Sequence, residues 1–176
     1  MSEPRSPILV VYFSRSGRTR RIAEMLASEL GADIEPICER RLGVGRKGAR
    51  SYVGSLVDAW LQRRADLLPA RHDVSSYDVV VVGSAVWARH ASAPAVTWLK
   101  EHGGHIQRLA LLCCLRRRGG TQALTQLARA AGKPAIASCV VAARDLRLGV
   151  DGLKRQAFAR SIRHRLPARR TTERVV

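Results

Sequence analysis

The stretch that decides the fold reads ILVVYFSRSGRT and runs from Ile8 to Thr19. Its first half, up to Phe13, is apolar without alternation, which is typical of a strand covered on both faces, as in a parallel sheet. From about Arg20 the apolar residues recur at helical spacing until Gly31, a residue type that favours the end of a helix. The stretch therefore predicts a buried strand, a short polar loop and an amphipathic helix.

The polar loop of this unit, Ser14–Thr19, has the composition and position of an anion-binding loop. It joins the carboxyl end of a strand to the amino end of a helix, where the first N–H groups lack partners and the helix dipole favours negative charge. Its three hydroxyls can donate to phosphate oxygens, and Gly17 permits a backbone conformation that larger residues resist. The loop predicts a phosphorylated cofactor, and the alternative is that its Ser and Thr residues only cap the helix.

Several other kinds of site lack their signatures in the sequence. No Gly-Lys-Ser/Thr closes the loop, which argues against ATP or GTP, and no Gly-x-Gly-x-x-Gly follows a strand, which argues against a conventional Rossmann dinucleotide site. The four cysteines fit no metal-binding spacing, so we expect no metal. Cys113, Cys114 and Cys139 are expected to be buried free thiols, and the alternative is a redox role.

The rest of the chain alternates between strand and helix patterns, as a doubly wound α/β sheet requires. Four further strands are expected, over residues 32–38, 78–84, 108–114 and 134–141. Further helices are expected over residues 92–101, 121–131 and 151–166, and near residues 51–64. The length of 176 residues predicts one domain over residues 1–176, with a core from about 8 to 166 and a basic tail over 167–176.

Two segments of the chain resemble the flavodoxin family, and short bacterial flavodoxin domain proteins in particular. The order from Val10 to Leu26, with its aromatic pair, Ser, Gly and Thr at fixed intervals, is similar to the amino-terminal signature of flavodoxins. The segment GSAVWARH, Gly83 to His90, looks like the family's Gly-Thr-Pro-Val-Trp segment. The resemblance extends to about Leu166 and implies a flavodoxin-like five-stranded parallel sheet in the order 2-1-3-4-5, with helices on both faces.

The resemblance also implies that FMN binds beyond the carboxyl ends of the strands, where three loops converge. These loops are expected over Ser14–Thr19, Ser84–His90 and Leu115–Gly120, with Trp87 near the flavin ring. The FMN-binding residues expected are Ser14, Arg15, Ser16, Gly17, Arg18, Thr19, Ser84, Ala85, Val86, Trp87, Ala88, Arg89, Leu115, Arg116 and Gly119. His90 is the candidate catalytic residue, as a proton donor to a bound acceptor, although a lone loop histidine is more often a bystander.

The chain is strongly basic, with 31 basic and 14 acidic residues and a formal net charge of +17. Of the basic residues 27 are arginine, and an arginine-rich, lysine-poor composition accounts for part of the excess. Because a reduced flavin tends to carry negative charge, basic surroundings are expected to raise its potential. The charge therefore favours an enzyme over a low-potential carrier, and it favours donors that bear phosphate groups.

These observations predict an FMN-dependent oxidoreductase that passes electrons from NAD(P)H to a quinone or a similar small-molecule acceptor. One alternative is a one-electron carrier that meets an acidic protein partner. Another is a basic binding protein that has kept the fold and lost FMN; its contacts with nucleic acid or an anionic membrane are disfavoured because aromatic residues are not interleaved with the basic tail. The amino terminus lacks a signal-peptide pattern and no apolar stretch is long enough to span a membrane, so a cytoplasmic location is expected.

Overall fold

The computed structural model describes residues 6–40 and 64–167. The helix expected near residues 51–64 and the basic tail expected over 167–176 fall outside these ranges, apart from Arg64 and Pro167 at their borders. In the described part no helix is both long enough and apolar enough to cross a membrane.

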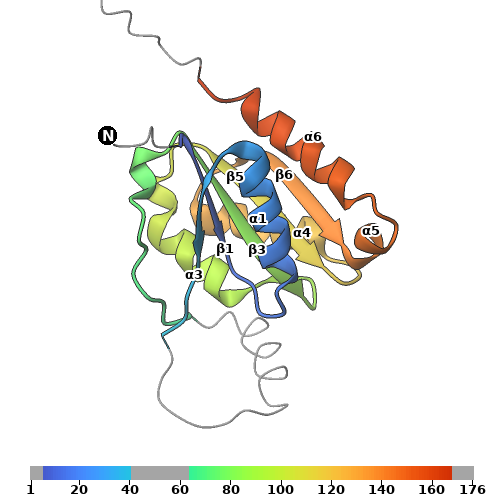
Figure 1. The fold of residues 1–176 in the computed structure, drawn as a ribbon. Coiled ribbons are helices and arrows are strands. Elements are labelled where there is room, and N and C mark those ends of the chain that lie inside the picture. Colours follow the sequence, from blue (N-terminus) through green and yellow to red (C-terminus); the bar gives the residue numbers. More distant parts are fainter. Residues whose placement is uncertain (1–5, 41–63, 168–176) are drawn as a thin grey trace, which may run out of the picture.

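Five parallel strands form the sheet, in the order β2-β1-β3-β5-β6 (Figure 1). These strands are β1 (Ile8–Tyr12), β2 (Asp33–Pro36), β3 (Val79–Trp87), β5 (Leu109–Leu115) and β6 (Ala135–Ala142). Numbered along the chain, the parallel strands have the predicted order 2-1-3-4-5, so this prediction is confirmed. A sixth strand, β4 (His90–Ala91), pairs antiparallel with the end of β3 and was not predicted.

The helices cover both faces of the sheet. They are α1 (Arg18–Leu30), α3 (Ala93–His102), α4 (Gly120–Ala131), α5 (Ala143–Arg147) and α6 (Asp151–Arg163), with short 3-10 turns at Val74–Ser76 and Gly103–His105. Helices α1 and α6 lie together on one face, and α3 and α4 lie on the other (Figure 1).

The continuous apolar runs follow from this two-sided cover. In β1, Leu9 and Val11 face the core beneath α3 and α4, whereas Ile8 and Val10 face the core beneath α1 and α6. Successive side chains of a strand point to opposite faces, so every position of a doubly covered strand must be apolar. The four valines of β3, Val79–Val82, are fully buried for the same reason.

The ends of several elements differ from the predictions. Strand β3 continues to Trp87 instead of ending near residue 84, because Ala85 and Val86 still pair with β5 and remain buried. The predicted loop Ser84–His90 is therefore mostly strand. Helix α6 ends at Arg163 instead of near residue 166, and the short helix α5 had no counterpart in the predictions.

The four cysteines are free thiols, and three of them are buried. Burial raises the pKa of Cys114 to about 12 and that of Cys139 to about 11, and it raises the pKa of Cys113 further. The prediction of buried free thiols at these three positions is confirmed, while Cys38 is exposed.

Candidate functional site

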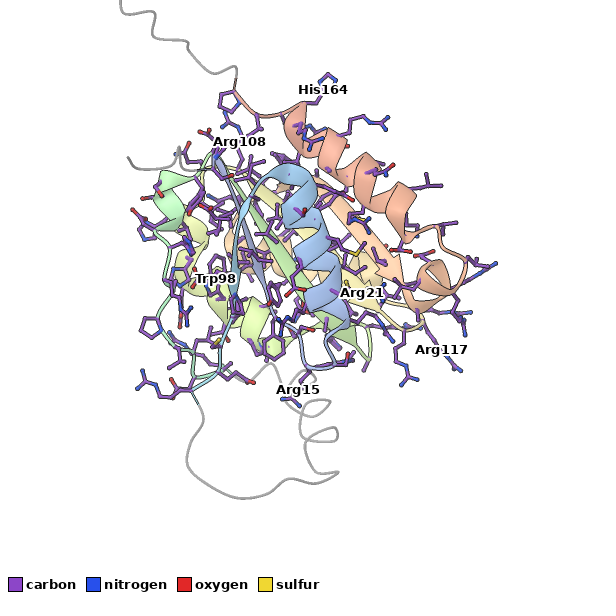
Figure 2. The ribbon with its side chains drawn as sticks, viewed as in Figure 1. Arg15, Arg21, Trp98, Arg108, Arg117 and His164 are labelled. Atoms are coloured by element: carbon purple, nitrogen blue, oxygen red, sulfur yellow. The ribbon has the colours of Figure 1, made fainter. Side chains whose placement is uncertain are left out.

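Loops that follow β1, β3 and β5 meet at the carboxyl edge of the sheet. The Arg15 guanidinium lies over the Trp87 ring, 5.7 Å from its centroid, which joins the first loop to the end of β3. In Figure 2 Arg15 and Arg117 lie at the same end of the sheet, where α1 begins. The predicted convergence of three loops on one region is therefore present in the structure.

The first loop has unused hydrogen-bond donors. Helix α1 starts after Gly17, whose φ of 81° is left-handed, and no side chain caps the helix. Within the described residues the amides of Ser14, Ser16 and Gly17 donate no hydrogen bond, and the buried Oγ of Ser14 has no partner. The alternative that these residues only cap the helix is not what the structure shows. The loop instead leaves a set of donors open for an anion at the helix terminus.

The predicted residues of this loop differ in their accessibility. Arg15, Ser16 and Gly17 are exposed, and Ser14 and Arg18 are half-buried. Thr19 is only 2% exposed and lies beside the Cys114 thiol in the core. Of the six residues expected to hold the phosphate, Thr19 is thus the least accessible to a ligand.

The second predicted segment supplies fewer accessible side chains than expected. Ser84 is fully buried, where its hydroxyl hydrogen-bonds the Ser92 hydroxyl at 2.9 Å and donates to the Ala85 carbonyl oxygen. Ala85 and Val86 are also buried, although Val86 lines a cavity together with Trp87. The expectation that Ser84 and Ala85 lie in an exposed loop is wrong, because β3 is longer than its sequence pattern indicated.

A strained turn closes this segment. Ala88 and Arg89 connect β3 to β4 as a two-residue hairpin turn and both have left-handed φ values, 46° and 70°. Such turns normally use Asn-Gly or a similar pair, because in the left-handed conformation a Cβ atom lies too close to the following carbonyl oxygen. Each left-handed residue that is not glycine costs about 1–2 kcal/mol. Backbone strain is therefore located beside Trp87.

The third loop, which follows β5, packs closely against the turn formed by Ala88 and Arg89. An ideal Cβ built on Gly119, where φ is 104°, would lie 2.4 Å from the Arg89 Cα atom. Only glycine fits there, because the two backbones approach too closely for any side chain. The predicted site residue Gly119 therefore has a definite structural task, which is to hold the second and third loops together.

A large cavity, here called the main cavity, opens beside the third loop. Its volume is about 1080 Å³, and it extends from Trp87 and Ala88 past Leu115 and Arg116 to α5. Its wall also contains Arg117, Arg118 and Gly120, which belong to the predicted third loop but were not among the expected FMN-binding residues. The residues of its wall outside the predicted loops are Thr121, Val140, Ala142, Arg144, Asp145, Arg147 and Lys154. One signal could have identified the residues after β6: all strands of a parallel sheet end at the same edge, so the loop after the last strand must reach the site as well.

The acidic residue of the main cavity is already neutralised. Asp145 accepts hydrogen bonds from the Lys154 ammonium at 2.6 Å and from the Ala142 amide at 2.8 Å. Both bonds stabilise the carboxylate, and they lower the pKa of Asp145. Throughout residues 6–40 and 64–167, Arg116, Arg117, Arg118, Arg144 and Arg147 form no ion pair. The cavity is therefore strongly positive.

His90 does not line the main cavity. It lies half-buried in β4 and borders a different hollow, of about 580 Å³ between α3 and α4, together with Lys100, Gln126 and Arg129. Arg89 and Thr121 border both hollows. The structure thus does not bring the predicted proton donor into the cavity that Trp87 and the third loop share.

Comparison with known proteins gives flavodoxins and flavoproteins. The family model described as Flavodoxin matches residues 7–106. A flavoprotein from Lactobacillus acidophilus NCFM, solved in complex with FMN, is 18% identical, with a TM-score of 0.65 over 81% of this chain and 95% of that chain. Flavoproteins of Bacteroides eggerthii DSM 20697 and Bacteroides uniformis ATCC 8492, both described as putative, are 22% and 18% identical.

These two Bacteroides structures give TM-scores of 0.62 and 0.64, cover 82% and 86% of this chain, and are themselves covered to 96% and 99%. No curated protein matches the sequence. At such identities the solved structures establish a shared fold, and the family match covers more than half of the chain.

Proposed function

The chain belongs to the flavodoxin family, and from this premise we propose that it binds FMN and acts as an oxidoreductase between NAD(P)H and a quinone or similar small acceptor. The observation that carries the proposal is the first loop, where a buried hydroxyl and several amides find no partner among the described residues, at an uncapped helix terminus. Buried polar groups are rarely left unpaired and bind protein groups, water, an ion or a ligand. A phosphate monoester supplies the acceptors that this loop lacks.

The residues of the first loop fit the phosphate of FMN. Ser14 and Ser16 would donate hydroxyl hydrogens, the amides up to Gly17 would donate N–H groups, and Arg18 would add positive charge. The FMN complex of the Lactobacillus acidophilus flavoprotein supports the same ligand here. When bound, FMN supplies the redox chemistry, accepting a hydride from the donor and giving electrons to the acceptor.

Trp87 is the residue that would lie along the flavin ring. It is half-buried at the end of β3, and one face of its indole is in contact with the Arg15 guanidinium. A flat aromatic ring can stack on an indole with ring centroids about 4.5–7 Å apart. Arg15 would then shift from the indole or lie at the edge of the stacked pair, close to the ring that becomes negative on reduction.

The positive charge at the carboxyl edge of the sheet favours an enzyme over a low-potential electron carrier. Positive charge near a group that becomes negative on reduction stabilises the reduced form and raises the potential. For a two-electron couple about 30 mV corresponds to roughly 1.4 kcal/mol, so a few partly screened arginines would raise the potential by tens of millivolts. The unpaired arginines of the main cavity lie on this edge.

Anaerobic reduction tests this function. The purified protein is saturated with FMN in a low-phosphate buffer, freed of excess flavin, and mixed with NADPH while the visible absorption is recorded. The proposal predicts that protein-bound flavin bleaches within the time of the experiment. Flavin that bleaches only with dithionite would identify a carrier instead, and a protein that retains no flavin would identify a fold that has lost its cofactor.

A further inference from the structure

Five arginines from three separate segments gather beside the main cavity. This arginine cluster consists of Arg18 on α1, Arg116 and Arg117 in the third loop, and Arg144 and Arg147 on α5. A second cavity of about 740 Å³ is bordered by Arg18, Ala143 and Leu146, and it shares Arg116, Arg117 and Arg147 with the main cavity. The two cavities therefore adjoin along a wall of guanidinium groups.

No carboxylate of the described residues forms an ion pair with this cluster. Asp145, the acidic residue of the main cavity, attracts Arg144 at longer range and is paired with Lys154. Like charges at short range raise the free energy of the unliganded protein, and an anion between them removes that cost. Guanidinium groups bind phosphate oxygens through paired, charge-assisted hydrogen bonds, which makes phosphate the best match for such a wall.

The cluster overlaps the loop that would hold the FMN phosphate only at Arg18, the first residue of α1. Ser14, Ser16 and Gly17 border neither of the two cavities, whereas Arg144 and Arg147 extend the positive wall to the far side of the third loop. The cavities thus provide room for a second phosphorylated ligand. The main cavity reaches Trp87 at its other end, so a ligand anchored at the arginines would have its other end beside the proposed flavin ring.

We propose that the arginine cluster is a subsite for the phosphate groups of the dinucleotide donor, and that it favours NADPH over NADH. This inference rests on the proposed function, because it assigns the donor its place next to FMN. The main cavity, at about 1080 Å³, slightly exceeds the range of about 300–1,000 Å³ that is typical of ligand sites, which suits a dinucleotide. A concave wall of this kind suits a small polyanion better than the flat surface of an acidic protein.

The preference for NADPH follows from the number of arginines. The pyrophosphate is common to both dinucleotides, and two or three guanidinium groups suffice to contact it. The remaining arginines would contact the additional 2′-phosphate, which NADH lacks. A site that has unpaired cations for this group binds the ligand that bears it more tightly.

Calorimetric titration with two redox-inactive fragments tests the subsite. Either 2′,5′-ADP or ADP is titrated into the FMN-saturated protein, and in parallel into the flavin-free protein, at low ionic strength. We expect 2′,5′-ADP to bind at least tenfold more tightly than ADP. In the double variant Arg144→Gln/Arg147→Gln the affinity for 2′,5′-ADP should fall by tenfold or more, while the affinity for FMN stays within about twofold.

A matched variant controls for the loss of two charges. Arg160 and Arg165 are exposed and border one hollow with His164, at the carboxyl end of α6 and just beyond it. Figure 2 shows His164 at the opposite end of the molecule from Arg117. The variant Arg160→Gln/Arg165→Gln lowers the net charge equally, and it should bind 2′,5′-ADP as the unaltered protein does. If the two variants weaken binding equally, the effect is one of overall charge and the subsite is refuted.

Two further outcomes would overturn the inference without touching the proposed function. In the first, the unaltered protein and the Arg144→Gln/Arg147→Gln variant bind 2′,5′-ADP with equal affinity. In the second, 2′,5′-ADP displaces bound FMN. Failure of the proposed function has a different signature, namely no retention of FMN, which the parallel titration records on its own. If the double variant loses its circular dichroism spectrum, Arg117→Gln replaces it, with the same tenfold expectation.

Discussion

Ser14 is the residue whose surroundings say most about the ligand. Its buried Oγ has no hydrogen-bond partner among residues 6–40 and 64–167, although an unpaired buried hydroxyl costs about 1–3 kcal/mol. The neighbouring Ser16 is exposed in the same loop, so its side chain can be changed with little effect on the core. This difference makes Ser16 the better position for a test of charge at the loop.

Placing a negative charge in the loop should expel FMN. The carboxylate of Ser16→Asp would lie against the cofactor phosphate, and juxtaposed like charges cost several kcal/mol, so we expect FMN affinity to fall by about a hundredfold or more. Fluorescence titration of the flavin-free protein measures this loss. The neutral variant Ser16→Asn should stay within about tenfold of the unaltered protein, and both should unfold at the same temperature. Equal affinity in the Asp variant would remove this loop from the site.

Replacing Trp87 should weaken the contact with the flavin ring. Aromatic pairs contribute about 0.5–1.5 kcal/mol beyond the area they bury, so Trp87→Ala is expected to reduce FMN affinity by roughly three- to tenfold. The bound flavin should also become more fluorescent, because a stacked indole quenches it. Trp87→Phe keeps an aromatic face and should restore most of the affinity. Unchanged affinity and fluorescence in the Ala variant would show that another residue covers the ring.

At the scale of elements, the contact between the turn of the β3–β4 hairpin and the third loop determines the shape of the site. Strand β3 could be predicted from its valines, but its extension to Trp87 could not, because Ala85 and Val86 follow a Gly-Ser pair that resembles the family's loop segment. The turn Ala88-Arg89 contains none of the residues that signal a two-residue hairpin. Its conformation depends on the tertiary contact with Gly119, which a local sequence pattern does not encode.

A side chain at Gly119 should destabilise the protein through this contact. Gly119→Ala would place a Cβ 2.4 Å from the Arg89 backbone, in addition to the strain of a positive φ. Gly132 also has a positive φ, 69°, but nothing lies within 4 Å of its ideal Cβ. Gly132→Ala should therefore cost about 1–2 kcal/mol of unfolding free energy, and Gly119→Ala clearly more, in urea denaturation. Equal losses would mean that the loop contact is absent in solution.

The arginines of α5 show what sequence reasoning missed in the site. The first-loop residues could be predicted because a strand, a polar loop and a helix follow one another locally. Arg144 and Arg147 carry no motif, and α5 is too short for a periodic pattern. They reach the site only because β6 ends at the same edge as β5, and its place there depends on the whole sheet.

At the scale of the whole molecule, the two layers of helices determine which cysteine thiols a reagent can reach. Cys113, Cys114 and Cys139 lie inside the sheet, whereas Cys38 is exposed. Burial raises the pKa of Cys139 to about 11 and that of Cys114 to about 12, so at pH 8 these groups remain thiols. Since the thiolate is the reactive form, a thiol reagent should not modify them in the folded protein.

Alkylation counted by mass spectrometry checks this arrangement. At pH 8 the folded protein should gain one carbamidomethyl group from iodoacetamide, on Cys38, and the urea-unfolded protein should gain four. Raising the pH to 9 should still leave the three buried thiols unmodified, because their pKa values lie well above 9. Rapid modification of Cys113 or Cys114 in the folded state would contradict the buried β5 strand.

The net charge of the whole molecule also affects how a specific phosphate site can be recognised. A net charge of +17 attracts every anion, so attraction alone is a poor measure of a specific site. A specific phosphate site must distinguish two ligands that share the flavin ring and differ only in the phosphate. FMN and riboflavin are such a pair.

The most direct test of the account is therefore a comparison of FMN with riboflavin, each titrated into the flavin-free protein at 0.15 M salt and followed by flavin fluorescence. The account predicts that FMN binds at least a hundredfold more tightly than riboflavin, because the loop at Ser14–Gly17 holds the phosphate. Equal affinity for the two flavins, or binding of neither, would contradict it.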